Sequence, residues 1–488
     1  MLKILIKKEI TETILDLRFI IVTCLCVVLI PLGIYVSLKE YEQRLQTCQT
    51  SVQQYQERSG GSVDYDSGAE GYRPPSPLSV FSGGLKNLLN LKVTTSSSGN
   101  PQIESRIEST NLQAVLFGNI DFVYIVSTVL SLLAFILTFS TITGEKEIGT
   151  LRLMLSNPIP RSHVILAKII GNYLVFLLPF ALSLFIGLLM LNASQSFTLV
   201  SRQVFPPIMI ILLVTLLFMF CIFCLGVLIS VLTHRSVVSM IVILLVWAAC
   251  ALIVPKISPR IAQIVYPIRS QMVVNVEKRM ARASLEEELR SKRGDLLKSI
   301  FAEKGIDYKE GDSNFDFEKA VDLTKEVYNQ AKVTVEREYK ERIDTAVRQI
   351  DNEYANKQRF QETISINLSR LSPVCCFTYA LSELAGTGTT ELDNFTSQAK
   401  QFQESVKQTI YDNIKVEVYQ LDGHDRWYIG DKPGFDSSEV QVPQFSDYQH
   451  TALAQALSAC WVDILMLVLF SILFFAGAFV SFIRYDVR

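Results

Sequence analysis

Hydrophobic residues gather in six segments of the chain, each long enough to form a helix that crosses a membrane. These segments lie at about 19–38, 122–143, 169–191, 207–232, 237–255 and 459–482. A hydrocarbon core of roughly 30 Å requires about 20 helical residues at about 1.5 Å per residue. The pattern therefore predicts an all-α polytopic membrane protein with six transmembrane helices.

Residues 1–18, before the first of these segments, have a helical pattern of their own. Apolar side chains recur there at helical spacing, at Leu2, Ile6, Ile10, Ile14 and Leu17. Charged residues lie off that face, at Lys3, Lys7, Lys8 and Glu12. We expect an amphipathic elbow helix at the membrane surface, with a plain helical lead-in to the first span as the alternative. Acidic residues before the first span also favour a retained span over a cleaved signal peptide.

A charged segment, residues 144–168, separates the second and third apolar segments. Its sequence is GEKEIGTLRLMLSNPIPRSHVILAK, with six charged residues that exclude it from lipid. Leu151, Leu153, Met154 and Leu155 form an apolar patch before the stop at Pro158. The 144–168 segment therefore predicts a short amphipathic helix on the membrane surface, the alternative being an ordinary polar loop.

Basic residues close to the span ends set the expected orientation. Short segments on one side of the membrane carry Lys3, Lys7, Lys8, Arg18, Lys146, Arg152, Arg161, Lys168, Arg235, Arg484 and Arg488. The other side receives two long regions of mixed charge, the first outer region (about 39–121) and the second outer region (about 256–458). We therefore expect both termini and the 144–168 segment in the cytoplasm.

The first outer region begins with residues 39–57, which lack Pro and Gly and continue the first span as a helix. A connector rich in Gly, Ser and Pro follows at 59–84, and short strands are expected within 92–110. The second outer region opens with two long helices, 270–303 and 316–370, separated by Gly305 and by the glycine and polar residues near 311–314. These helices predict a hairpin on the outer membrane surface. The outer regions together are expected to form a large, mainly helical extracytoplasmic domain with some β-structure.

An apolar stripe on the second helix indicates how the hairpin packs. Its residues are Phe317, Val321, Tyr328, Val335, Tyr339, Ile343, Val347, Ile350 and Tyr354. Residues 368–388, which come next, are apolar for an exposed loop. We expect them to pack against the spans as a helix that begins at Ser372-Pro373 and ends at Gly386-x-Gly388.

Composition and motif content exclude several functions. Hydrophobic residues make up 49% of the 488 residues and charged residues 19%, too apolar for an ordinary soluble protein and too charged to lie wholly in lipid. The chain has no GxxxxGK[ST] phosphate loop, HExxH run or GxSxG elbow, and its four histidines do not cluster with other metal ligands in the sequence. No catalytic, cofactor or metal site is therefore expected.

Cysteines and charges within the spans carry little further signal. Cys221-x-x-Cys224 has metal-ligand spacing but lies in an apolar span, where cysteine acts as a small apolar residue. A bridge from Cys48 to Cys375 or Cys376 is open on sequence grounds. Ionisable groups are read as almost absent from the spans, apart from Asp121 at an outer edge, which argues against an ion-coupled carrier.

The 144–168 segment resembles, in residue order and position, the cytoplasmic coupling segment of permeases of the type-2 ABC exporter family. That family has an acidic pair, Gly-Thr-Leu, a leucine-rich turn, a Pro-containing stop, Arg, and a Lys that opens the next span. The matching residues here are Glu145, Glu147, Gly149, Thr150, Leu151, Leu155, Pro158, Arg161 and Lys168. Residues 74–85, 120–147 and 368–388 also resemble a subgroup with large outer loops, labelled as transporters for multicopper-enzyme maturation or gliding motility.

The resemblance implies a permease subunit without an ATPase site of its own. The elbow helix is also a feature that it implies. The 144–168 segment would dock into a groove of a separate ATPase subunit, whose dimer would bind ATP and Mg²⁺. The permease would pair with a second copy of itself or a related permease in the bacterial inner membrane. No nucleic-acid partner is expected.

Three functions compete on the sequence. The first is ATP-driven export of a substrate that the sequence does not identify. The second is an ABC-type machine that transmits force to a periplasmic or envelope partner without cargo passing through the spans, which the long outer helices favour. The third is a membrane-anchored sensor or interaction protein without an ATPase, and the 144–168 segment argues against it.

Overall fold

A computed structural model describes most of the chain as two compact units. The described residues are 2–59, 69–86, 92–95, 102–103, 121–156, 159–195, 197, 204–306, 317–421, 424–431, 445 and 448–485. The first unit comprises residues 1–259 and 367–488, and the second comprises residues 260–366. Each unit is described by itself.

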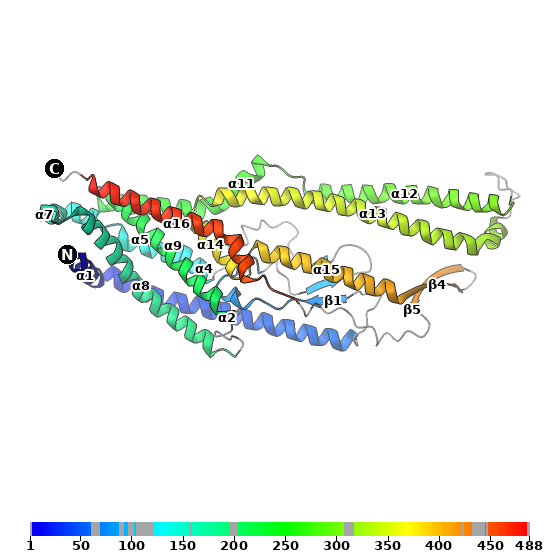
Figure 1. Cartoon of the computed structure of the whole chain (residues 1–488), viewed down its shortest axis with the longest axis horizontal. Helices are drawn as coiled ribbons and strands as arrows, with labels where there is room; N and C mark the ends of the chain where they lie inside the picture. The colour runs from blue at the N-terminus through cyan, green and yellow to red at the C-terminus, as the bar shows by residue number, and fades with distance from the viewer. Residues whose placement is uncertain are drawn as a thin grey trace. The chain divides into compact units, whose positions relative to one another are not determined.

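Six helices in the described residues are long and apolar enough to cross a membrane, which confirms the predicted fold class. The first is α2 (Leu17–Ser59), and the second is built from α4 (Phe122–Tyr124), a π-helical turn (Ile125–Leu130) and α5 (Ser131–Thr138). The others are α8 (Arg161–Ala193), α9 (Phe205–Leu232), α10 (Ser236–Ala248) with its extension, and α16 (Leu453–Ile483). A π-helical turn (Ala249–Ile253) extends α10 into α11 (Val254–Val265). The short α1 (Leu2–Ile14) precedes them (Figure 1).

Helix α9 forms the centre of the first unit. It is apolar on all sides and packs against α5 and α16, so that Phe218, Phe223 and Val227 are fully buried. Gly226 allows the close approach to α5, because a Cβ at this position would collide with the hydroxyl of Thr138. A helix that is hydrophobic all round is expected at the core of such a bundle.

A short helix, α14 (Pro373–Leu384), packs against α9 and α16 and is almost entirely buried. Ser372 caps its first turn by accepting a hydrogen bond from the backbone N–H of Val374, and Gly386 follows its end with a φ of 64°. The Phe377 ring stacks on Phe218 with ring centroids 4.3 Å apart. The predicted helix in residues 368–388 and its packing on the spans are confirmed.

Helix α15 (Thr389–Asn413) and a small sheet form a second core in this unit. Strands β1 (Ala69–Tyr72), β2 (Lys92–Thr95) and β3 (Gln102–Ile103) pair antiparallel in that order, with Gly71 opposite Val93. Val93, Phe395 and Phe402 are among the residues of this core. The strands expected within 92–110 are confirmed, whereas β1, an edge strand, falls inside the predicted connector.

The structure also contains a two-stranded β-hairpin that was not predicted. Strands β4 (Ile414–Leu421) and β5 (His424–Asp431) pair antiparallel, with Glu417 opposite Tyr428. A single turn of 3₁₀-helix (Pro77–Val80) completes the described elements of the first outer region.

The second unit contains an antiparallel hairpin of two long helices, as predicted. Helix α12 (Gln271–Glu303) begins after the cap residue Ser270, and α13 (Phe317–Ser369) runs back beside it. Cross-helix contacts join Glu288 to Tyr339 at 2.9 Å, Arg293 to Glu336 at 2.6 Å and Lys278 to Asp351 at 2.9 Å. In the predicted stripe, Tyr339 and Val347 are buried. Gly305 follows α12 with a φ of 72°, whereas residues 311–314 lie outside the described residues.

Candidate functional site

The 144–168 segment forms two short helices and the start of α8. Helix α6 (Thr143–Ile148) ends at Gly149, and α7 (Thr150–Ser156) follows it. Gly149 has a φ of 83°, a left-handed conformation that glycine adopts without steric cost. A Cβ at this position would meet nothing within 4 Å, so within this chain the glycine serves the bend and no close approach.

Apolar side chains of α6 and α7 divide between an inner and an outer face. Leu151 is buried against Val164, Val231 and Phe482, and Met154, Leu155 and Ile159 pack on the same cluster. Ile148 and Leu153 point away from it and are 79% and 70% exposed. The exposed apolar surface of this segment is therefore formed by Ile148 and Leu153, whereas Leu155 contributes to the chain's own core.

A buried ion cluster fixes α6 to two other helices. The ammonium of Lys168, on α8, lies 3.1 Å from Glu9 on α1 and 2.8 Å from Glu145 on α6. Lys168 is only 2% exposed, and α1 approaches α8 closely because Gly171 lies against Glu9. Burial raises the pKa of Glu9, and Lys168 opposes that effect. A buried charge is tolerated when partners surround it, so Lys168 holds α1, α6 and α8 together.

Two more residues of α6 fasten it to the turn between α9 and α10. The carboxylate of Glu147 accepts hydrogen bonds from the backbone N–H and the hydroxyl of Ser236, at 3.0 and 2.6 Å. Lys146 donates to the carbonyl oxygens of Val231 and Thr233. Because Glu147 binds the first turn of α10, its negative charge also suits the positive end of that helix dipole.

Arg161, at the start of α8, binds the end of α16. Its guanidinium donates to the carbonyl oxygens of Ile483 and Tyr485, both at 2.9 Å. These contacts bring α1, the 144–168 segment, the turn near Arg235 and the end of α16 to one end of the bundle (Figure 1). The compartment that this end faces stays a prediction.

The residues predicted to couple to the ATPase therefore differ in their exposure and in their contacts within the chain. Glu145, Glu147 and Arg161 make contacts inside the chain, and Gly149 forms the bend. Thr150 is exposed. Pro158 lies outside the described residues.

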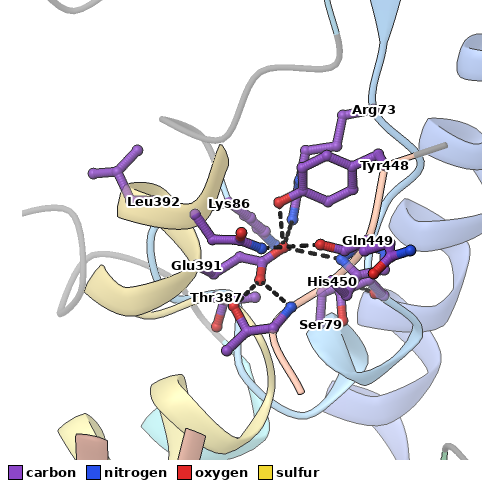
Figure 2. Close-up of polar contacts among 12 residues, drawn as sticks. Arg73, Ser79, Lys86, Thr387, Glu391, Leu392, Tyr448, Gln449 and His450 are labelled. Atoms are coloured by element: carbon purple, nitrogen blue, oxygen red, sulfur yellow. Dashed lines mark hydrogen bonds and ion pairs between the residues drawn. The ribbon is translucent and has the colours of Figure 1, made fainter. Parts of the chain in front are cut away.

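A second polar cluster, which the sequence did not reveal, surrounds Glu391 on α15 (Figure 2). One carboxylate oxygen contacts Arg73 at 2.8 Å, the hydroxyl of Tyr448 at 2.7 Å and Nδ1 of His450 at 2.9 Å. The other accepts hydrogen bonds from the backbone N–H and the hydroxyl of Thr451. The Glu391 cluster therefore joins the first outer region, α15 and the residues that lead into α16.

Electrostatics in the Glu391 cluster favour the ionised acid. Burial alone would raise the pKa of Glu391, but hydrogen bonds from His450 and Thr451 and the charge of Arg73 hold it far below its usual range. Arg73 is itself 3% exposed and lies near the rings of Phe395 and Tyr448. A buried ion pair of this kind costs stability when one partner is removed.

A third charged pair corrects the reading that ionisable groups are almost absent from the spans. Asp463 lies inside the predicted span 459–482 and is 2% exposed. Arg370 contacts its two carboxylate oxygens at 2.7 and 3.0 Å. The prediction did not include Asp463, whose carboxylate is paired with Arg370.

Cysteine positions give no metal or disulfide site among the residues that the structure describes. All nine cysteines are free. They include Cys48, Cys375 and Cys376, between which the sequence allowed a disulfide bond. No group of three or more His, Cys, Asp or Glu in the described part of the chain has the geometry to hold a metal ion.

A protein-family model matches almost the whole chain. The model of a family described as ABC-2 family transporter protein matches residues 3–487. None of the curated proteins matches the sequence. The family match covers the six apolar helices, the 144–168 segment and both outer regions together.

Proposed function

Because this chain belongs to the ABC-2 family of transporter proteins, we propose that it couples ATP hydrolysis by a separate subunit to the export of a substrate. Family membership makes it the membrane permease subunit of an ABC transporter.

One observation carries the coupling proposal. Ile148 on α6 and Leu153 on α7 present exposed apolar side chains on a segment that Glu145 and Glu147 fasten to the bundle. Large apolar side chains beside polar ones, at a membrane-protein surface outside the spans, are typical of a docking site. We propose that this surface docks into a groove of an ATPase subunit.

The contacts of α6 indicate how a push on this surface would reach the spans. Lys168 connects α6 to α1 and α8, Glu147 connects it to α10, and Lys146 to the end of α9. Arg161 adds α16 through the start of α8. A rigid-body displacement of the 144–168 segment would therefore move several helices together, as required when closure of the ATPases reorganises a permease.

The proposed complex contains two ATPase subunits and two permeases. ATP and Mg²⁺ would bind to the ATPases, since this chain has no phosphate-binding loop. The second permease would be another copy of this chain or a related one. We place the complex in the bacterial inner membrane, with both termini and the 144–168 segment in the cytoplasm.

The docking proposal is tested by Leu153→Asp. A charge on the exposed face would be left without solvent in the ATPase groove, and truncation of a central interface residue typically costs about 2 kcal/mol or more, roughly 30-fold in affinity. We expect loss of ATPase co-purification and of stimulated ATP hydrolysis, while the permease still inserts. Leu371→Asp is the matched control, because Leu371 is also 70% exposed but lies beside α14. Equal ATPase binding by both variants would refute the docking surface.

Force transmission without cargo is a second candidate function, favoured by the contacts along α16. At the C-terminal end of α16, Arg161 binds the backbone. Within α16, Asp463 binds Arg370, which directly follows α13. Just before the start of α16, Thr451 binds Glu391. Helix α16 thus links the 144–168 segment to the elements at its other end.

Replacement of residues 270–366 by a flexible linker separates the two functions. For an exporter, we expect ATPase assembly and hydrolysis to persist with at most altered substrate choice. For a force-transmitting machine, hydrolysis persists while every cellular phenotype of the complex is lost. Growth phenotypes and ATP hydrolysis by the purified complex are the measurements.

A further inference from the structure

Helix α10 belongs to the apolar helix that the rest of the chain covers least. Among the described residues, 11% of the apolar stretch of this helix is buried, against 61% for α9 and 67% for the second span. Only Ser239 and Ile243 of the 13 residues of α10 are buried. Because few side-chain contacts hold α10 to the bundle, its displacement breaks less packing than displacement of α9 would.

The start of α10 is held by the 144–168 segment. Glu147 on α6 accepts hydrogen bonds from the backbone N–H and the hydroxyl of Ser236, the first residue of α10. Helix α8, which Lys168 joins to α6, instead has buried residues at intervals from Val164 to Leu191. A displacement of α6 would therefore move the start of α10 more easily than it would move α8.

At its other end, α10 continues into the π-helical turn formed by residues 249–253. A π-helical turn contains an extra residue that takes backbone hydrogen bonds out of the α-helical register, and helices bend at such turns. The hydroxyl of Ser372, which is fully buried, donates to the carbonyl oxygen of Cys250 at 2.8 Å. Ser372 also caps α14, so the turn is fastened to a helix that is almost entirely buried.

A second hydrogen bond holds the residues just before this turn. The indole N–H of Trp247 donates to the hydroxyl of Ser131 on α5 at 3.1 Å, directly after the π-helical turn of residues 125–130. Phe135, Trp247 and Val374 are among the residues that line a small apolar cavity here. Since protein interiors are otherwise close-packed, this space allows α10 to change its angle near the turn without displacing packed side chains.

We infer that residues 249–253 are the pivot about which α10 swings when the 144–168 segment moves, and that Ser372 is the positioning residue that fixes this pivot. The start of α10 is displaced together with Glu147, while its end stays with α14. The inference rests on the proposed function, because it names the helix that moves relative to the core when the ATPases close. It predicts a displacement that decreases along α10 towards the pivot.

Distance measurements in the assembled transporter test the pivot. Gd³⁺ spin labels are attached to p-azidophenylalanine, which avoids the native cysteines, and labelled permease is diluted with unlabelled permease. One label replaces Leu213 on α9, and the other replaces Val237 at the start of α10 or Leu252 at the pivot, where the native side chains are 64%, 68% and 43% exposed. On trapping with ATP and vanadate, we expect the Val237–Leu213 distance to change by about 2 Å or more and the Leu252–Leu213 distance to stay fixed.

Three outcomes would overturn the pivot. Equal changes in both distances would mean that α10 moves as a whole. An unchanged Val237–Leu213 distance during continued ATP hydrolysis would mean that α10 does not move, and both results would leave the coupling proposal standing. A permease that binds no ATPase would refute the proposed function, and the pivot with it.

Substitutions of Ser372 test its role as the positioning residue. Ser372→Gly keeps a favourable cap residue for α14 but removes the donor to Cys250. We expect the Leu252–Leu213 distance to change on trapping in Ser372→Gly and to stay fixed in Ser372→Thr, which retains the hydroxyl. Ser270→Gly, which removes the cap hydroxyl of α12, is the matched control and should behave as wild type. A fixed distance in Ser372→Gly at unchanged ATP hydrolysis would refute the role of Ser372.

Discussion

At the scale of single residues, buried charges determine which segments are held together. Lys168, Glu391 and Asp463 are each 2% exposed or less, and each contacts an oppositely charged residue from another part of the chain. Such clusters add little net stability compared with apolar packing, but removal of one partner leaves an uncompensated charge. Their effect is to fix one arrangement of the helices.

The Glu391 cluster predicts a defined pH dependence. The pKa of Glu391 is lowered by folding, so its carboxylate stabilises the folded state at pH values above the unfolded pKa of about 4.3, and this stability is lost as pH falls below it. At pH 7, Glu391→Gln should lower the free energy of unfolding by about 3–5 kcal/mol. The difference from wild type should shrink towards pH 3.

Unfolding of the detergent-purified chain between pH 7 and pH 3 measures this effect. Glu404→Gln, at an exposed position of the same helix, is the control and should change stability little at either pH. A constant difference between Glu391→Gln and wild type across this range would contradict the assigned electrostatics.

At the scale of elements, a single backbone conformation sets the faces of α6 and α7. Gly149 interrupts the helix, so that Leu151 turns into the core while Leu153 stays exposed. A continuous helix through this position would rotate α7 relative to α6. The bend therefore decides which apolar residues are available to a partner.

Substitutions at Gly149 separate conformation from side-chain volume. Gly149→Ala places no atom in a clash, but a left-handed conformation costs an alanine about 1–2 kcal/mol. Gly149→Asn adopts that conformation more readily. We expect weaker ATPase co-purification with Gly149→Ala than with Gly149→Asn at equal expression. Stronger loss with the larger asparagine would mean that space, and not the bend, matters at this position.

At the scale of the whole molecule, the contacts at one end of the first unit agree with the grouping of basic residues in the sequence. Lys168 on α8 binds Glu9 of α1 and Glu145 of α6. Lys146 of α6 binds the end of α9, and Arg161 of α8 binds the end of α16. The short basic segments that the charge rule assigns to one side are thus brought to one end of the bundle. The second unit contributes a long helical hairpin with its own antiparallel contacts.

The orientation is tested by cysteine labelling in a cysteine-free background. Thr150→Cys on α7 and Gly294→Cys on α12 introduce exposed thiols, and the structure leaves space at Gly294 for the added side chain. A membrane-impermeant maleimide added to intact spheroplasts should label Gly294→Cys only. Thr150→Cys should react after the membrane is permeabilised. Labelling of both from outside would refute the assigned topology.

Local sequence patterns are sufficient to predict the helical fold, the six long apolar helices, the α12–α13 hairpin and helix α14. Apolar periodicity, the Ser372-Pro373 start and the glycine stops act within a few residues. The β4–β5 hairpin was not predicted, although Asp422-Gly423 between two polar–apolar runs is a local signal for it.

The pairing of charged residues and the burial of individual apolar residues depend on contacts between distant parts of the chain. Glu391 and Arg73 are 318 positions apart, and Glu9 and Lys168 are 159 apart, so no local pattern shows that they meet. Leu153 and Leu155 look alike in the sequence, yet Leu153 is exposed whereas Leu155 is half-buried against the apolar cluster that contains Leu151. Pairing of distant charges and burial of a helix face depend on the complete fold, because both require surfaces that other segments supply.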